Sequence, residues 1–332
     1  MMSDHFIKNI EIKNFKCFED FKAEGFGRVN LIGGKNNVGK TAFMEAVYVN
    51  VHARDINYTI YALYAIEHTR NYIEYISNSN EEPEIYKVLN KIKNYEVQSN
   101  LRETNFHIEL KNSKKIYYIL GNKLNKEDFS QDFEDYDDIE NIYFIDNIGF
   151  TNYELELSYK TVQLKDKEEL LNKYINIFDN SIEKFKIIQN QAKCKVKNGD
   201  YKDINDFGDG LKEYISIISS LYACEKGCLF IDEIGNGIHH SKLDKLWEII
   251  LIIAKEQNVQ VFATTHSKEC IKALVTANTE DINTYQPKEQ LLGSEEIKFI
   301  ELGRTDGKID SIVFDFDELK NEVEQNMEIR GW

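Results

Sequence analysis

Short, largely apolar runs recur along this chain, and three of them end at residues with candidate chemistry. Val29–Ile32 lead into a glycine-rich loop, Cys228–Ile231 end on two adjacent carboxylates, and Val259–Thr265 end on a histidine. Continuous apolar runs of this length are typical of strands buried in a parallel sheet, whose C-terminal ends open onto a ligand crevice. The pattern therefore predicts three buried strands, each followed by candidate site residues.

The segments around these runs differ in character. Residues 6–33 have strand-like patterns, and helical character begins after Lys40. Residues 52–104 are polar and are predicted to be helical, and strand-like runs follow at 106–110 and 115–120. We expect residues of about 51–140 to form a helical and β insertion in the core. No sustained heptads are present, which excludes a long coiled coil.

The glycine-rich segment at residues 34–41 matches the pattern G-x-x-x-x-G-K-[S/T] between a predicted strand and a predicted helix. Glycines let the backbone wrap around an anion, and N–H groups at a helix N-terminus then point at phosphates. Lys40 would place its charge on the β- and γ-phosphates, and the Thr41 hydroxyl would be a Mg²⁺ ligand. A chance glycine turn is the alternative, which the strand, loop and helix order disfavours. The candidate nucleotide-binding residues are Gly34, Asn36, Asn37, Gly39, Lys40 and Thr41.

The acidic pair follows the apolar run at Cys228–Ile231. We expect Asp232 to hold the Mg²⁺ shell and Glu233 to orient or deprotonate the attacking water. Acidic residues that merely end a strand at the surface are the alternative. The glycine-rich loop upstream favours the catalytic interpretation.

Two further elements complete the set. Gly208, Asp209 and Gly210 open an apolar helix, and His266 ends the last of the three apolar runs. A single histidine at a strand end is usually packed or solvated. The four elements occur in the order loop, glycine pair, acidic strand and histidine strand.

Composition limits the class of protein. The chain has 332 residues, of which 42% are hydrophobic, and only 2 are proline. No apolar run reaches the length of a membrane span, and the first residues do not form a signal peptide, so a cytoplasmic protein is expected. Among the 5 cysteines, Cys224 and Cys228 with His239 and His240 suggest a metal site, but buried free thiols are the favoured interpretation.

Charge is distributed unevenly along the chain. The formal net charge of −16 argues against a surface that coats nucleic acid, although a local basic strip remains open. Acidic residues crowd residues 127–140, either as a DNA-mimicking or partner-docking surface or, as we favour, as a solvated loop. Five lysines alternate with apolar residues in a predicted hairpin closed by residues 198–200, where they meet phosphates or protect a strand edge. These lysines are Lys184, Lys186, Lys193, Lys195 and Lys197.

The order of the four elements resembles that of ABC-type ATPases. Within that superfamily, the N-terminal Ile10–Phe18, the acidic strand with the following Ile234–His240, and Thr264–Ser267 resemble the AAA-type ATPases of the RecF, SMC and OLD (overcoming lysogenization defect) group. The resemblance covers roughly residues 1–50 and 141–332. It implies an α/β P-loop NTPase fold, an ABC-type head with a mixed β-sheet over residues 1–332. It also implies that His266 contacts the γ-phosphate and that residues 208–210 are a signature loop.

Three features depart from that group's pattern. Gly208 stands where the signature loop of transporters has a serine, so contact there would use backbone N–H groups. Gln163 is the nearest candidate for a glutamine loop, but we expect it to be structural. Asp315 and Asp317 resemble a Toprim nuclease site, yet too few residues follow His266 for that domain, and we interpret them as surface acids before a final helix.

The resemblance implies an ATP- and Mg²⁺-dependent ATPase that forms a head-to-tail homodimer or higher homo-oligomer. Relatives of this form act as the ATPase component of bacterial anti-phage modules, with a separate effector such as a Toprim nuclease. The alternatives are a RecF-like DNA repair or recombination ATPase, for which nucleic acid would be a partner, and a non-catalytic nucleotide-gated scaffold. No membrane partner is expected.

Overall fold

The computed structural model describes residues 4–77, 89, 91–112, 114–124, 141–279 and 291–326. A mixed six-stranded sheet at its centre has the order β15-β14-β3-β13-β12-β8. Its strands are β3 (Val29–Gly34), β8 (Ile142–Ile145), β12 (Cys228–Ile231), β13 (Gln260–Thr264), β14 (Ile297–Thr305) and β15 (Lys308–Asp315). All are parallel except β15, which forms an antiparallel hairpin with β14. The three predicted buried strands are therefore adjacent, as β3, β13 and β12.

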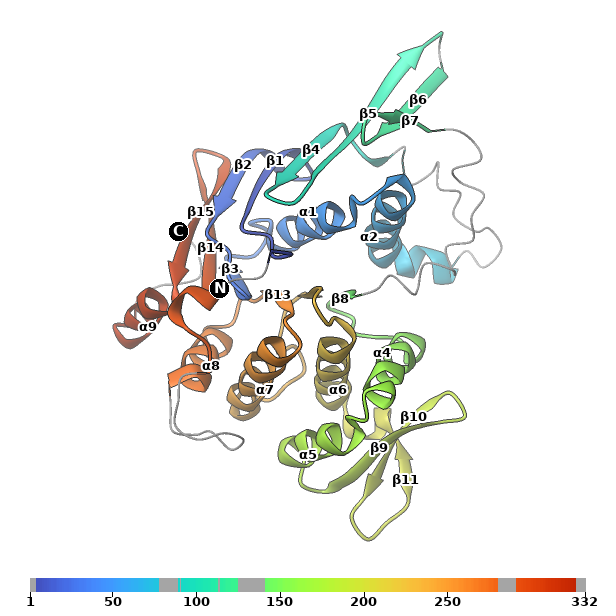
Figure 1. Ribbon diagram of the computed structural model, residues 1–332, viewed down its shortest axis with the longest axis vertical. Helices are drawn as coiled ribbons and strands as arrows, with labels where there is room; N and C mark the ends of the chain where they lie inside the picture. Colours follow the sequence, from blue (N-terminus) through green and yellow to red (C-terminus); the bar gives the residue numbers. More distant parts are fainter. Residues whose placement is uncertain are drawn as a thin grey trace.

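Each face of this sheet carries its own core, which explains why the strands are continuously apolar. Leu229 and Ile231 of β12 pack into one core and Phe230 into the other. Figure 1 shows α1 and α2 on one side of the sheet and α6, α7 and α8 on the other. These helices are α1 (Lys40–His52), α2 (Ile56–Ser77), α6 (Asp209–Ala223), α7 (Leu243–Glu256) and α8 (Lys268–Thr279).

A second, antiparallel sheet lies over α1 and has the order β2-β1-β4-β5-β6-β7 (Figure 1). Its strands are β1 (Asn9–Phe15), β2 (Phe18–Glu24), β4 (Tyr95–Ser99), β5 (Glu103–Lys111), β6 (Lys114–Ile119) and β7 (Asn122–Lys123). The predicted runs at 106–110 and 115–120 are confirmed as β5 and β6. The prediction of helix as far as Thr104 is wrong, because β4 alternates buried and exposed residues and pairs with β1.

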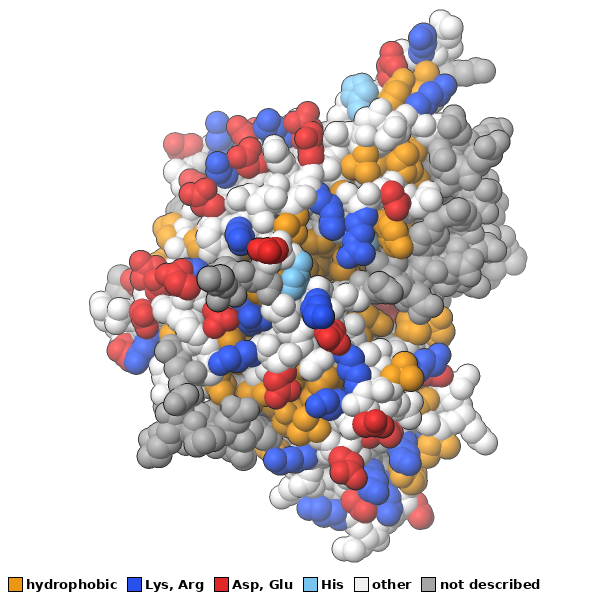
Figure 2. Space-filling view, viewed as in Figure 1, with side chains coloured by type: hydrophobic (Ala, Val, Ile, Leu, Met, Phe, Trp, Pro, Cys, Tyr) orange, Lys and Arg blue, Asp and Glu red, His pale blue; other side chains and the backbone are white. Residues whose placement is uncertain are grey.

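A third, three-stranded sheet lies beyond α6, with α4 (Asn152–Leu164) and α5 (Glu168–Phe178) packed beside it. Its strands are β9 (Ile182–Ile188), β10 (Gln191–Val196) and β11 (Tyr201–Asp203). Lys186 pairs with Lys193 and Lys184 with Lys195, so the turn between the lysine-bearing strands lies at residues 189–190. Residues 198–200 instead close the β10–β11 hairpin, which corrects the predicted position of the turn. Figure 2 shows basic side chains interspersed with acidic ones at this end of the molecule.

Several smaller predictions concern the chain's termini and thiols. The predicted final helix is confirmed as α9 (Phe316–Glu324), and Asp315 caps that helix by accepting a hydrogen bond from the Glu318 N–H. The β14–β15 hairpin before it turns at residues 306–307. Cys224 and Cys228 are buried free thiols, as favoured. Short 3-10 helices lie at Ile204–Phe207, His240–Lys242 and Ser294–Glu296.

Two findings apply only to the part of the chain that is described. No helix there is long and apolar enough to cross a membrane, and no group of side chains there is arranged to hold a metal ion through three His, Cys, Asp or Glu ligands. The acidic stretch at residues 127–140 lies outside the described residues.

Candidate nucleotide site

The candidate site is built at the C-terminal ends of four neighbouring parallel strands. β3 leads into the glycine-rich loop, β12 into Asp232, β13 into His266, and β8 into Asp146. Because parallel strands end at the same edge of a sheet, residues far apart in the sequence meet there. Sequence analysis predicted three of these strand ends and missed the fourth.

The loop between β3 and α1 requires glycine at both ends. Gly34 has φ 149°, and a Cβ there would lie 2.6 Å from the Leu302 carbonyl oxygen. Gly39 has φ 106°, and a Cβ there would lie 2.9 Å from the Cys17 sulfur. A side chain at either position would force the backbone apart, whereas the bare loop leaves Asn36 and Asn37 exposed at the N-terminus of α1.

Lys40 is held against the loop that precedes it. Its Nζ donates to the carbonyl oxygens of Gly34 at 3.1 Å and Lys35 at 3.3 Å, and its side chain is only 6% exposed. The Glu233 carboxylate lies 3.8 Å from the same ammonium. A buried cation that faces mainly backbone carbonyls is suited to receive an anionic ligand.

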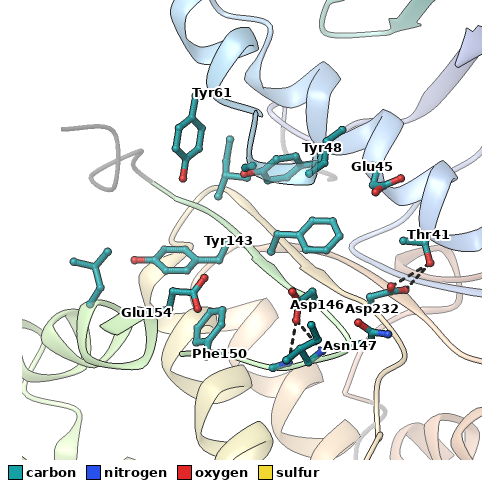
Figure 3. Close-up of a pocket in the computed structure, with 17 residues that line it drawn as sticks. Thr41, Glu45, Tyr48, Tyr61, Tyr143, Asp146, Asn147, Phe150, Glu154 and Asp232 are labelled. Carbon is teal, nitrogen blue, oxygen red and sulfur yellow. Dashed lines mark hydrogen bonds between the residues drawn. The ribbon is translucent and has the colours of Figure 1, made fainter. Parts of the chain in front are cut away.

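Thr41 and Asp232 meet across the strand edge. The Thr41 hydroxyl lies 3.1 Å from both carboxylate oxygens of Asp232, and the Thr264 hydroxyl donates to Asp232 Oδ1 at 2.6 Å (Figure 3 shows the first pair). Burial raises the pKa of Asp232, while the two hydroxyl hydrogen bonds act in the opposite direction. Hydroxyl and carboxylate oxygens are the ligands that Mg²⁺ prefers, so these two residues fit the ion.

Glu233 connects the other candidate residues. Its backbone has φ 54°, a left-handed conformation uncommon for glutamate, and its N–H donates to the Thr264 hydroxyl at 2.8 Å. One carboxylate oxygen lies 2.6 Å from His266 Nδ1, and the other faces Lys40. Backbone strain at such a position is retained where the surroundings impose it, and here the strain directs the carboxylate toward the site edge.

Asp146 is a residue that sequence analysis missed. It follows β8 directly and lines the same cavity as Thr41 and Asp232 (Figure 3). Its Oδ1 accepts hydrogen bonds from the N–H groups of Ile148 and Gly149, and burial raises its pKa. The signal was present, because Ile142–Asp146 is an apolar run ending in aspartate, as is Leu229–Asp232. Gln163, by contrast, is exposed in α4 and hydrogen-bonds Glu168, outside this edge.

The predicted signature segment opens α6 at a second part of this edge. Gly208 has φ 81° and precedes the helix, and Asp209 lines a smaller cavity together with Asp146 and Asp232. A Cβ on Gly210 would lie 2.3 Å from the Gly237 carbonyl oxygen, so Gly210 packs against the loop after the acidic strand of its own chain. Within the described residues, no hydrogen bond links residues 208–210 to residues 34–41.

This fold and this strand-edge site define an ATPase of the ABC type, in the RecF and SMC group, with a P-loop. The chain belongs to the family described as "AAA domain, putative AbiEii toxin, Type IV TA system", which matches residues 29–271.

Known proteins agree with that placement. The chain is 27% identical over 340 residues to an "ATP/GTP phosphatase" of Helicobacter pylori, covering 85% of this chain and 91% of that protein. It is 43% identical over 49 residues to the "DNA replication and repair protein RecF" of Bacillus cytotoxicus, covering 15% of this chain and 13% of that protein.

Among solved structures, an SMC head bound to the C-winged helix domain of ScpA superposes with a TM-score of 0.54, at 14% identity, over 94% of this chain and 99% of that chain. The SMC head of Pyrococcus furiosus bound to the C-terminal domain of ScpA gives a TM-score of 0.50, at 12% identity, over 97% and 99%. At these identities the likeness concerns the fold alone.

Proposed function

We propose that the protein binds ATP with Mg²⁺ and hydrolyses it at the strand-edge site, as a single head with residues of about 51–140 inserted. The observation that carries this proposal is the convergence of Lys40, Thr41, Asp232, Glu233 and His266 from three neighbouring strand ends. In the proposal the loop N–H groups and Lys40 bind the phosphates, and Thr41 and Asp232 hold Mg²⁺.

Glu233 and His266 have separate roles in the proposed hydrolysis. Glu233 positions the attacking water and accepts its proton, because its carboxylate is fixed by strained backbone and lies at the site edge. His266, 2.6 Å from Glu233, contacts the γ-phosphate and keeps that carboxylate in place. Bound Mg²⁺ would neutralise charge that develops on the phosphate oxygens.

We also propose that two copies associate head to tail around two nucleotides. Each site would then combine the Gly34–Thr41 loop of one subunit with residues 208–210 of the other. The separation of these segments within one chain supports the proposal, as does the exposure of Gly208 and Asp209 at the N-terminus of α6. A helix N-terminus with bare N–H groups is suited to a phosphate that arrives from outside.

In the proposed biological role, ATP controls a separate effector, such as a Toprim-type nuclease, within a cytoplasmic bacterial anti-phage defence module. The description of the family as a toxin of a type IV toxin–antitoxin system supports a two-component arrangement. A RecF-like role in DNA repair is the second candidate, favoured by the 49-residue match to RecF, and in that case DNA would be the partner.

The proposed role of Glu233 in ATP hydrolysis is tested by Glu233→Gln. We expect the variant to bind ATP normally and to hydrolyse it roughly a hundredfold to ten-thousandfold more slowly, the usual weight of a positioned base. Steady-state turnover and calorimetric ATP binding are measured side by side. Glu169→Gln, at an exposed position on α5, is the matched control and should turn over normally. Turnover of Glu233→Gln within about threefold of wild type would assign the water to another residue.

The two candidate biological roles are distinguished by the identity of the neighbouring gene and by a DNA-binding measurement. An adjacent effector gene whose product protects cells from phage only together with an active ATPase supports the defence role. Salt-sensitive binding of DNA by the isolated protein, with no such neighbour, supports the repair role instead.

A further inference from the structure

The cavity that Asp146 shares with Thr41 and Asp232 extends well beyond the candidate nucleotide site. A cavity of about 470 Å³ opens between α1 and α2 on one side and the segment from β8 to α4 on the other (Figure 3). Thr41 and Asp232 form one end of its wall, and the rest extends away from the phosphate loop beneath α1. A cavity of this size is in the range that holds drug-sized ligands.

The walls of this cavity are aromatic. Tyr48 and Tyr61 come from the two helices, and Tyr143, Phe144 and Phe150 come from β8 and the loop after it. Tyr48 is held by edge contacts with Phe144 and Phe230, whose ring centroids lie 5.3 and 5.5 Å away. Ring faces fixed by such packing present a rigid surface on which a flat or cationic group can rest.

The Tyr48 hydroxyl points into this space. The side chain is 5% exposed, yet within the described residues its hydroxyl makes no hydrogen bond, and Figure 3 shows it directed into the cavity toward Tyr61. The hydroxyl is not among the side-chain oxygens that are buried without a partner, so it opens onto the cavity. It can therefore donate a hydrogen bond to, or accept one from, a ligand placed there.

The charge of the lining selects the kind of ligand. Four carboxylates contribute to the walls, and none of the described lining residues is Lys, Arg or His. The carboxylates belong to Glu45, Asp146, Glu154 and Asp232. Glu45 is paired with Lys16 at 2.6 Å, and Asp232 belongs to the candidate Mg²⁺ site. Among the described residues, the Glu154 carboxylate accepts hydrogen bonds from the N–H and hydroxyl of Thr151, at 2.7 and 2.8 Å, and forms no ion pair.

We propose that this cavity binds a small organic cation with a flat apolar body, of the arylalkylamine class. The ring would lie among the tyrosine and phenylalanine faces, and the ammonium would interact with Glu154 and the Tyr48 hydroxyl. Because the negative charge on the walls repels phosphates, this cavity does not suit a second nucleotide. The ligand would contact both α2 and α4, which belong to opposite sides of the central sheet.

Two probes that share an indole ring test the proposal on the full chain without nucleotide. Tryptamine carries a cation and indole-3-acetate an anion, so the ring is matched and the sign of the side-chain charge is reversed. Isothermal titration should show saturable binding of tryptamine, and binding of indole-3-acetate should be at least about tenfold weaker. Equal binding of the two probes, or no saturable binding of tryptamine up to millimolar concentration, would overturn the proposal.

Three variants locate the bound cation. Glu154→Gln keeps a side chain able to cap α4 and should weaken tryptamine binding by about fivefold or more. Glu156→Gln, on the same helix but outside the lining, is the matched control and should bind as wild type. Asp232→Asn distinguishes binding in the aromatic cavity from binding at the candidate metal site. If this variant lost tryptamine binding while Glu154→Gln kept it in full, the cation would lie at the metal site and the assignment would be refuted.

Discussion

Thr264 is the residue that fixes the two acidic side chains relative to each other. It is fully buried in β13, donates to Asp232 Oδ1, and accepts from the Glu233 N–H. The hydroxyl therefore connects a carboxylate proposed for the metal to the strained backbone of the proposed base. These hydrogen bonds could not be predicted from the sequence, where Thr264 is a threonine at the end of an apolar run.

Replacing this hydroxyl gives a test at the residue scale. Thr264→Val keeps the shape but leaves the Glu233 N–H without its acceptor, so we expect a loss of about 1–3 kcal/mol in the free energy of unfolding and slower ATP turnover. Thr264→Ser keeps the hydroxyl and should retain most turnover. Denaturant unfolding and steady-state kinetics measure both, and a fully active Thr264→Val would show that the connection is dispensable.

At the scale of elements, short-range pattern predicted the strands that are buried on both faces. β3, β12 and β13 are continuous apolar runs, and their order of chemistry along the chain was enough to expect a shared edge. β8 has the same apolar pattern ending in an acid, but it is short and belongs to none of the motifs that resemble the ATPase group, so Asp146 was not predicted.

Strand pairing between distant segments could not be predicted from the sequence. β4 lies in a polar region, and its pairing with β1 and β5 makes Tyr95 and Val97 buried strand residues. The lysines of β9 and β10 alternate as predicted. The turn between these strands, at residues 189–190, has no glycine, and the sequence instead predicted a turn at residues 198–200, which contain Gly199. Local propensity is overridden wherever tertiary pairing supplies the stabilisation.

Helix α6 carries a buried acid whose ionisation should control stability. Glu213 faces the loop at Gly149, and burial, with a smaller contribution from Asp146, raises its pKa from 4.5 to about 7. Because the folded pKa exceeds the unfolded one, the protein should lose stability as the pH rises from about 4.5 to 7 and level off above that range.

Removing the charge should remove that pH dependence. Relative to wild type, Glu213→Gln should gain roughly 3 kcal/mol in the free energy of unfolding at pH 8, from the size of the pKa shift, and the gain should shrink as the pH falls toward 5. Urea unfolding at pH 5, 7 and 8 measures the difference. A gain that stays constant with pH would mean that the Glu213 carboxyl titrates near its usual value.

At the scale of the whole molecule, the proposed site has two halves, and no hydrogen bond joins them within the described residues of one chain. Residues 34–41 and residues 208–210 are positioned by different cores on opposite faces of the central sheet. The exposed start of α6 faces outward, so a second copy could supply it to the phosphate loop. Asp209 is a better position than Gly210 for testing this, because Gly210 is packed against Gly237 of the same chain and a side chain there would damage the fold.

Mixing two inactive variants tests whether sites are shared. Lys40→Ala should lose ATP binding, and Asp209→Trp should keep ATP binding but block the approach of the partner's nucleotide, so each homodimer is inactive. In a mixed dimer one composite site carries both defects and the other carries neither. We therefore expect turnover to reappear on mixing, up to about a quarter of the wild-type rate, because about half of randomly assorted dimers are mixed and each has one intact site. Mass spectrometry confirms that mixed dimers form, and an inactive mixture that contains them would rule out independent shared sites.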